Sequence, residues 1–172
     1  MSMCCGQRKI DKKRILLCVP VLLVLVFMAF APIAAVADPA DFITMYRDFF
    51  QNVKEKKYQK VWDAMTIASK SWIAKEIADA AVKMNKDVTQ AQLYAMLEAD
   101  TSNVRTNFFN NFNVYSEKTS LLSQILVAPY SVKSSTKERV VLTITLAGEP
   151  KDFQIIQEEG KWKINFFDDL SR

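Results

Sequence analysis

The sequence predicts an α+β fold, in which N-terminal helices pack on a curved antiparallel sheet of about four strands. Up to about residue 113, hydrophobic residues recur every three to four positions, which is typical of helices with one buried face. From about Tyr115 the period shortens to two, which indicates strands. Because a Glu159-Gly160 turn joins the last two strands as a hairpin, we expect an antiparallel sheet with the helices on one face.

The first predicted helix has the clearest pattern. Its hydrophobic residues follow the i, i+3, i+4, i+7 spacing from Phe42 to Val53. The preceding Asp38-Pro39 supplies an N-cap and a first-turn proline. A second apolar stripe, at residues 58–65, predicts another helix after a lysine-rich turn.

Two further helices are predicted from their capping residues. Ser69 or Ser71 could cap the third helix, and Thr89 could cap the fourth, since short hydroxyl side chains satisfy free amides at helix starts. Residues 101–113 are polar but carry three phenylalanines. We expect this segment to be a short helix or an ordered loop that places aromatic rings on the core.

The sheet is predicted from four strand-like segments. The first covers residues 121–132, with a bend at Pro129, and is apolar on both faces. The second covers residues 139–146, the third lies around Phe153, and the last covers residues 162–166. A strand with two apolar faces needs cover on both sides, so another layer of this chain or a partner should cover the outer face of the first strand.

The N-terminal residues have the order of a bacterial export signal. Basic residues precede an apolar block at 15–31, and Pro32 and an Ala-Val-Ala stretch follow. We expect cleavage after Ala37, so that residues 1–37 form the signal peptide and residues 38–172 form a single exported domain, periplasmic or secreted. The alternative is that residues 15–37 remain as an inner-membrane anchor.

The charge balance of residues 38–172 argues against nucleic-acid binding. The chain's net charge of +4 comes from the predicted signal, and the rest has 18 basic and 18 acidic residues. Domains that bind nucleic acid usually carry a clustered basic excess. The densest basic run, residues 54–57, is interpreted as a solvated helix end.

Missing residue types exclude several kinds of chemistry. All three cysteines lie in the predicted signal, and the chain has no histidine. The exported domain therefore has no disulfide, no thiolate nucleophile, no histidine general base and no imidazole metal ligand. The acidic pairs 158–159 and 168–169 are interpreted as surface residues. No catalytic residue, metal or cofactor is predicted.

These features resemble the nuclear transport factor 2-like superfamily, the cystatin-like α+β cone, in its secreted bacterial versions. The resemblance is carried by the aromatic first helix pair up to Val61-Trp62, by Ser69-Lys70 and by the closing hairpin at 159–164. It implies a curved sheet wrapped around helices, with a conical apolar cavity open at one end. Members of the superfamily include isomerases, polyketide cyclases, scaffold proteins and transport proteins, so the resemblance does not select a function.

Aromatic residues are the main candidates for a binding site. Residues 38–172 contain nine Phe, five Tyr and three Trp, which could line a cavity between the helices and the sheet or form an ordinary core. The predicted ligand-binding residues are Trp62, Trp72, Tyr94, Phe108, Tyr130 and Trp162.

Three functions remain open from the sequence. The first is an exported, non-enzymatic binding or accessory domain that holds a small apolar or lipid-like ligand. The second is a small isomerase- or cyclase-like enzyme using Asp and Tyr, although Asp152 should face away from the core and Asp63 and Asp100 flank the apolar stripes. The third is an interaction protein that docks a partner, or a second copy as a homodimer, through the outer sheet face. Membrane contact is expected only through an uncleaved signal.

Overall fold

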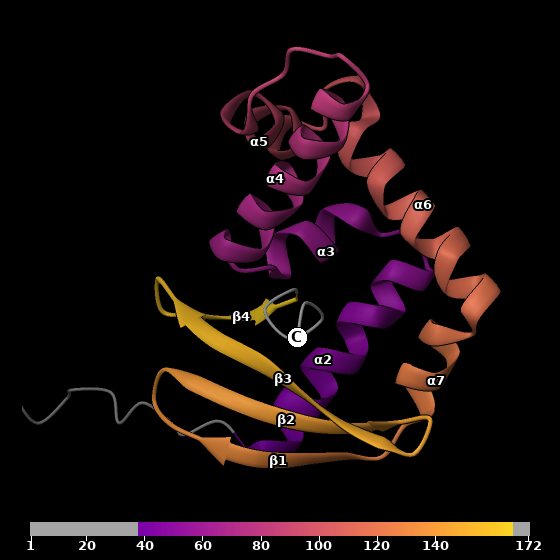
Figure 1. Ribbon diagram of the computed structural model, residues 1–172. Helices are drawn as coiled ribbons and strands as arrows, with labels where there is room; N and C mark the ends of the chain where they lie inside the picture. The colour runs from indigo at the N-terminus through magenta and orange to yellow at the C-terminus, as the bar shows by residue number, and fades with distance from the viewer. Residues whose placement is uncertain (1–37, 167–172) are drawn as a thin grey trace, which may run out of the picture. The chain divides into compact units, whose positions relative to one another are not determined.

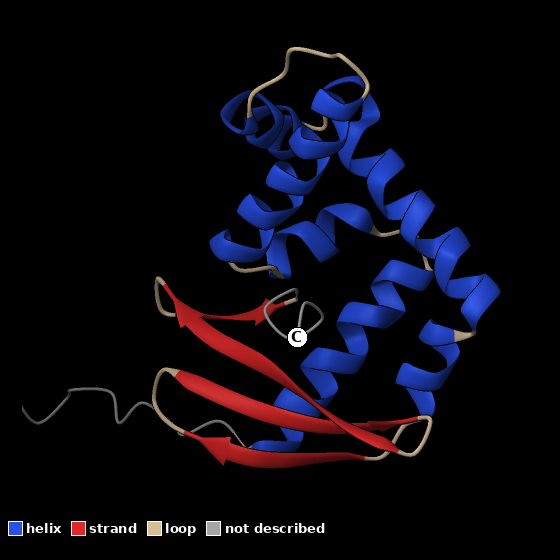
Figure 2. Ribbon diagram, in the orientation of Figure 1, coloured by secondary structure: helices blue, strands red, loops and turns tan. Residues whose placement is uncertain are grey.

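The computed structural model describes residues 38–166, which form one α+β unit (Figures 1 and 2). The predicted fold class is confirmed, because six helices precede a four-stranded antiparallel sheet within these residues. The predicted signal and the acidic pair at 168–169 lie outside the described residues. The helical elements are α2 (Pro39–Lys54), α3 (Tyr58–Ala64), α4 (Ile67–Lys83), α5 (Gln90–Ala99), the 3₁₀ turn η1 (Thr101–Asn103), α6 (Val104–Thr119) and α7 (Leu121–Val127).

The sheet contains β1 (Tyr130–Ser135), β2 (Arg139–Leu146), β3 (Glu149–Glu158) and β4 (Lys161–Asn165), in that spatial order. Each strand pairs antiparallel with the next, so the predicted hairpin connections are confirmed. Helix α2 runs along one face of the sheet, whereas α4 and α5 lie beyond the β4 edge (Figure 1).

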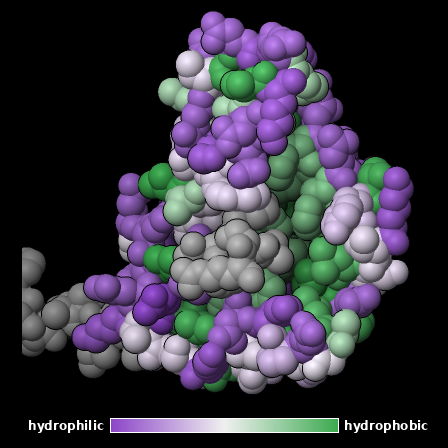
Figure 3. Space-filling model, viewed as in Figure 1, coloured by the Kyte–Doolittle hydropathy of each residue, from purple (hydrophilic) through white to green (hydrophobic). Residues whose placement is uncertain are grey.

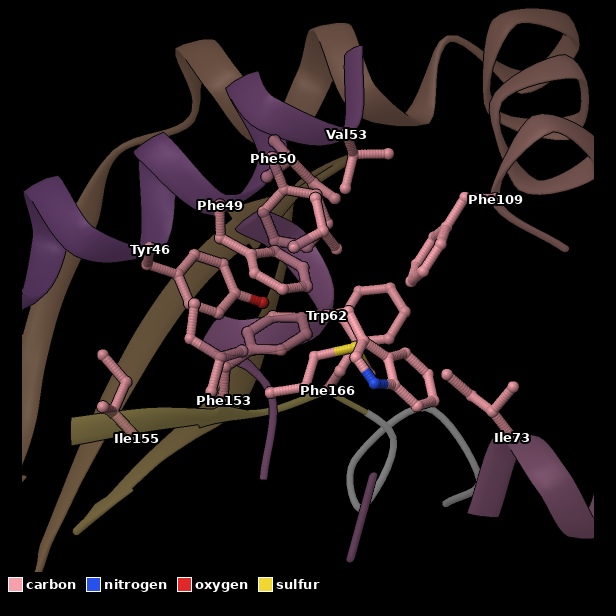
Figure 4. Close-up of a cluster of buried hydrophobic side chains, with 14 of the residues drawn as sticks. Tyr46, Phe49, Phe50, Val53, Trp62, Ile73, Phe109, Phe153, Ile155 and Phe166 are labelled. Atoms are coloured by element: carbon pink, nitrogen blue, oxygen red, sulfur yellow. The ribbon is translucent and has the colours of Figure 1, made fainter. Parts of the chain in front are cut away.

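The core lies between α2 and the inner face of the sheet and continues towards α3 and α6. The rings of Tyr46 and Phe153 lie 5.3 Å apart, which joins α2 to β3, and Trp62 from α3 is completely buried. Figure 4 shows these side chains pointing towards one another from helices and strands. Fully burying one such side chain contributes about 1.5–3 kcal/mol. Aromatic packing therefore holds the helices to the sheet.

Two of the predicted caps are present. Asp38 accepts a 2.9 Å hydrogen bond from the amide of Ala40, and Thr89 accepts one of 3.2 Å from the amide of Gln92. The third helix, α4, instead begins after Thr66, whose hydroxyl accepts from the amide of Ser69. The expected caps Ser69 and Ser71 are therefore inside α4.

The predicted strand at 121–132 is wrong over most of its length. Residues Leu121–Val127 form α7, and the strand begins only at Tyr130. Leu122 and Ile125, three positions apart, are the buried residues of this helix. A short apolar run fits a buried helix as well as a strand, and the sequence pattern does not separate the two. The residues that suggested a strand with a second apolar face therefore belong to the helix α7.

The segment after residue 100 is more helical than expected. The short helix or loop predicted at 101–113 is the 3₁₀ turn η1 followed by the sixteen-residue helix α6. As predicted, this segment places an aromatic ring in the core, since Phe109 is fully buried. Within residues 38–166, no helix is long and apolar enough to cross a bilayer.

Candidate functional site

The structure places the six predicted aromatic site residues at several points of the packing between helices and sheet. Trp162 packs edge-on against Phe42 of α2, with ring centroids 4.8 Å apart. Tyr130 packs against Tyr46 of the same helix at 5.9 Å. Phe108 packs against its neighbour Phe109 at 5.2 Å. These three rings belong to the packing around α2 and α6.

The structure brings two of the predicted residues, Trp62 and Tyr94, close to the carboxylate of Glu98. Lys70 forms an ion pair of 3.1 Å with Glu98, and its Nζ atom lies 5.1 Å from the centre of the Trp62 ring. Burial raises the pKa of Glu98, but the polar groups of Trp62, Lys70 and Tyr94 and the charge of Lys70 lower it more. The pKa of Glu98 therefore lies below its usual value. Trp72 lies on α4 and is half-buried.

The surface feature best suited to binding is an open basic depression between the start of α3 and the start of α6. Its volume is about 480 Å³. We call it the basic depression. Four of the lining side chains are basic and one is acidic. The lining residues are Lys56, Lys57, Tyr58, Gln59, Lys60, Asp100, Arg105 and Thr106.

Two left-handed turns shape the basic depression. Lys56 has a φ of 58° and ends the turn after α2, which places the following lysines at the start of α3. Asp100 has a φ of 49° and ends α5. Its carboxylate accepts a 3.1 Å bond from the Thr106 amide and a 2.7 Å bond from the Thr106 hydroxyl. Asp100 therefore fixes the start of α6 against the end of α5.

Arg105 is the most unusual residue of the basic depression, because its guanidinium is buried and its ion pair with Asp100 is a long one. The side chain is about 7% exposed, and its Nη2 atom lies 3.8 Å from a carboxylate oxygen of Asp100. Nη1 donates 3.2 Å bonds to the carbonyls of Leu97 and Glu98, which caps the end of α5. Nη2 donates a 2.6 Å bond to Oε1 of Gln59. Within the described residues, Nε has no hydrogen-bond partner.

The lysines at the rim add positive charge that is only partly balanced. Lys57 pairs with Glu55, and hydrogen bonds from Gln51 and Lys57 lower the pKa of Glu55. Among residues 38–166, neither Lys56 nor Lys60 forms an ion pair. Because the ion pair of Arg105 with Asp100 is long and these two lysines have none within residues 38–166, the basic depression is suited to an anion.

Two other depressions are less suited to a ligand. On the outer sheet face, a depression of about 620 Å³ is lined by Pro150 and five polar or charged residues. One of them, Asp152, accepts hydrogen bonds from Thr143 (2.6 Å) and Lys133. Asp152 faces away from the core, as predicted. Along α2, a depression of about 360 Å³ combines Met45 and Phe49 with acidic residues. Among the described residues, no three carboxylates form a group that could hold a metal.

The groups expected for an Asp/Tyr enzyme are engaged elsewhere. Asp63 is exposed and accepts a 2.8 Å bond from Gln59, and Asp100 holds Thr106. Tyr130 donates a 2.7 Å bond to the carbonyl of Ile125, and burial raises its pKa to about 12. A phenol with that pKa stays protonated at neutral pH.

Sequence reasoning missed the basic depression. The lysine run at 54–57 was interpreted as a solvated helix end, yet Lys56 and Lys57 lie at its rim. Arg105 gave one usable signal: it precedes Phe109 by four positions and Asn113 by eight, which places it on the buried face of α6.

No known family model, curated protein or solved structure matches the chain.

Proposed function

We propose that this protein is an exported, non-enzymatic binding domain that holds an anionic group of its ligand in the basic depression. The observation that carries the proposal is Arg105, a buried cation whose ion pair with Asp100 is long, at 3.8 Å. Three lysines surround it at the surface. A bound anion would add to the distant counter-charge of Asp100 and would accept the charge-assisted hydrogen bonds that guanidinium groups form best.

Binding is favoured over catalysis because the polar groups near Arg105 are committed to structural bonds. Tyr58 donates a 2.8 Å bond to Asn110, and Asp100 accepts both bonds from Thr106. A general base or nucleophile needs a free lone pair aimed at a substrate. The lysines and Arg105 offer positive charge and hydrogen-bond donors, which hold a ligand without transforming it.

An apolar ligand between helices and sheet has less support. Such a ligand would have to displace rings that already contact one another at 4.8–5.9 Å. Docking through the outer sheet face was inferred from a strand with two apolar faces at residues 121–132. Residues 121–127 form a helix instead, so this reason for expecting a partner no longer applies. The outer face also carries polar residues whose hydrogen bonds are made, such as Thr143 and Asp152.

Export is part of the proposal and rests on the sequence order of residues 1–37. Expression of the full-length chain in a bacterium, followed by N-terminal sequencing of the periplasmic protein, tests it. A start at Asp38 is the expected result. An intact Met1 in the membrane fraction would contradict cleavage and favour the anchor at 15–37.

Anion binding is tested by calorimetric titration of the purified protein with inorganic phosphate and with citrate, at low and at high sodium chloride. We expect saturable binding at low salt that weakens at high salt, because salt screens exposed charges. The absence of saturable binding of either anion at millimolar concentrations would overturn the proposed function.

A further inference from the structure

The partners of Arg105 differ in how easily they can leave. The carbonyls of Leu97 and Glu98 belong to the end of α5 and cannot move without unwinding it. The third acceptor, Oε1 of Gln59, belongs to an exposed side chain on α3 with several rotatable bonds. Only this acceptor can be exchanged without disturbing the backbone.

Gln59 is also held weakly on its other side. Its amide nitrogen donates a 2.8 Å bond to Asp63, an exposed residue of the same helix. Such exposed interactions between side chains of one helix contribute little to stability. A neutral amide oxygen is moreover a weaker partner for a guanidinium than an oxygen of an anion. The Gln59 side chain therefore occupies a position where an anionic oxygen would bind better.

The charge of the basic depression indicates which anion. Four basic residues and one acidic residue line it, so a doubly charged group is favoured over a singly charged one. A phosphoryl group carries close to two negative charges near neutral pH and presents three acceptor oxygens. One oxygen can take the place of Oε1 on Nη2, and the others can meet the lysines at the rim.

We propose that the basic depression binds a phosphoryl group, and that the Gln59 carboxamide occupies its place on Arg105 until the ligand displaces it. This inference rests on the proposed function and adds the ligand class and the residue that competes with it. The phosphoryl group could be free phosphate or the phosphate ester of a small molecule.

Two substitutions at Gln59 make opposite predictions. Gln59→Ala removes the competitor and should tighten phosphate binding by about fivefold, the value of one net hydrogen bond. Gln59→Glu replaces the amide by a carboxylate that forms an ion pair with Arg105 and competes with the ligand, so it should abolish binding. Lys60→Gln is the matched control, because it lowers the lining charge by the same amount without reaching Arg105, and it should weaken binding only about two- to threefold.

The experiment is a calorimetric titration of the wild-type protein and these three variants with inorganic phosphate and with glycerol 3-phosphate, and of the wild type with citrate as well. Stronger binding of the ester identifies the ligand as a phosphate ester, and stronger binding of inorganic phosphate identifies it as the free ion. Thermal melting checks that each variant is folded, and the ¹⁵N–¹H signals of the Arg105 guanidinium should shift when phosphate is added to the wild type.

Unchanged or weaker binding by Gln59→Ala, with the wild type still binding, overturns the displacement alone. Wild-type binding of citrate but of neither phosphate compound overturns the ligand class, and no wild-type binding of any anion overturns the proposed function as well.

Discussion

The hydroxyl of Ser69 on α4 donates a 3.0 Å hydrogen bond to the side-chain oxygen of Asn165 on β4, and both residues are buried. Ser69 also accepts a 2.8 Å bond from the amide of Phe166. The backbone adds to this connection, because the amide of Thr66 donates a 3.0 Å bond to the carbonyl of Ile164. This polar network joins the start of α4 to the last strand of the sheet.

Removal of the Ser69 hydroxyl should destabilise the protein. Ser69→Ala leaves the buried amide of Phe166 without this acceptor, and an unsatisfied buried polar group costs about 1–3 kcal/mol. Urea denaturation of the variant and the wild type measures the difference in the free energy of unfolding. Ser123→Ala, at an exposed position of α7, is the control and should change it by less than about 0.5 kcal/mol. A loss of stability in Ser69→Ala no larger than in Ser123→Ala would mean that the Ser69 hydroxyl does not stabilise the fold.

Trp62 should act through the core rather than by touching a ligand. Its side chain is completely buried, and its ring centre lies 5.9 Å from Cζ of Arg105. Trp62→Ala should lower the free energy of unfolding by about 3–5 kcal/mol, as other large aromatic deletions do. Trp72→Ala removes a half-buried ring and should cost clearly less. Urea unfolding followed by circular dichroism compares the two, and an equal or larger cost at Trp72 would contradict this assignment.

Asp100 should make stability depend on pH in the acid range. Burial favours a higher pKa, but hydrogen bonds from Thr106 and the charge of Arg105 outweigh it, so the pKa of Asp100 lies below its usual value. A lowered pKa stabilises the folded state above the pKa of the unfolded chain, and this contribution is lost as the pH falls through the folded-state pKa. The stability difference between wild type and Asp100→Asn should therefore be full at neutral pH and shrink below about pH 4.

Urea denaturation between neutral and acid pH measures this dependence. Thr106→Val is a second variant, because it removes the 2.7 Å hydroxyl bond to Asp100 and should reduce the same pH dependence. A difference between wild type and Asp100→Asn that does not change between neutral and acid pH would contradict the role of the Asp100 charge.

Removal of two rim lysines should weaken anion binding without affecting the fold. Lys56→Gln combined with Lys60→Gln removes the two rim cations that have no ion pair in residues 38–166. We expect phosphate affinity to fall about fivefold, with little change in melting temperature. Lys83→Gln combined with Lys86→Gln changes the net charge equally at exposed positions outside the basic depression. An equal loss in both double variants would indicate a general charge effect instead of a site.

Local signals in the sequence were sufficient wherever one short segment decides its own structure. Asp38 and Thr89 cap helices as predicted, because a cap needs only a side-chain oxygen and an amide two or three residues later. The Glu159-Gly160 turn forms for a similar reason, since both residues take positive φ values between two alternating strands. These signals, with the change of hydrophobic period, predicted the α+β class and the hairpin order.

Tertiary structure decided the features that depend on distant residues. Leu121–Val127 forms a helix, because Leu122 and Ile125 are buried in the core on one side of it. The same sequence of apolar residues is also compatible with a strand. Ser69 was expected to cap α4, but its hydroxyl is used by Asn165 and Phe166 at the other end of the chain. The position of Arg105 depends on the end of α5, on Gln59 and on Trp62, which only folding brings together. A buried charge is defined by what surrounds it in space, and its neighbours in the sequence do not reveal those surroundings.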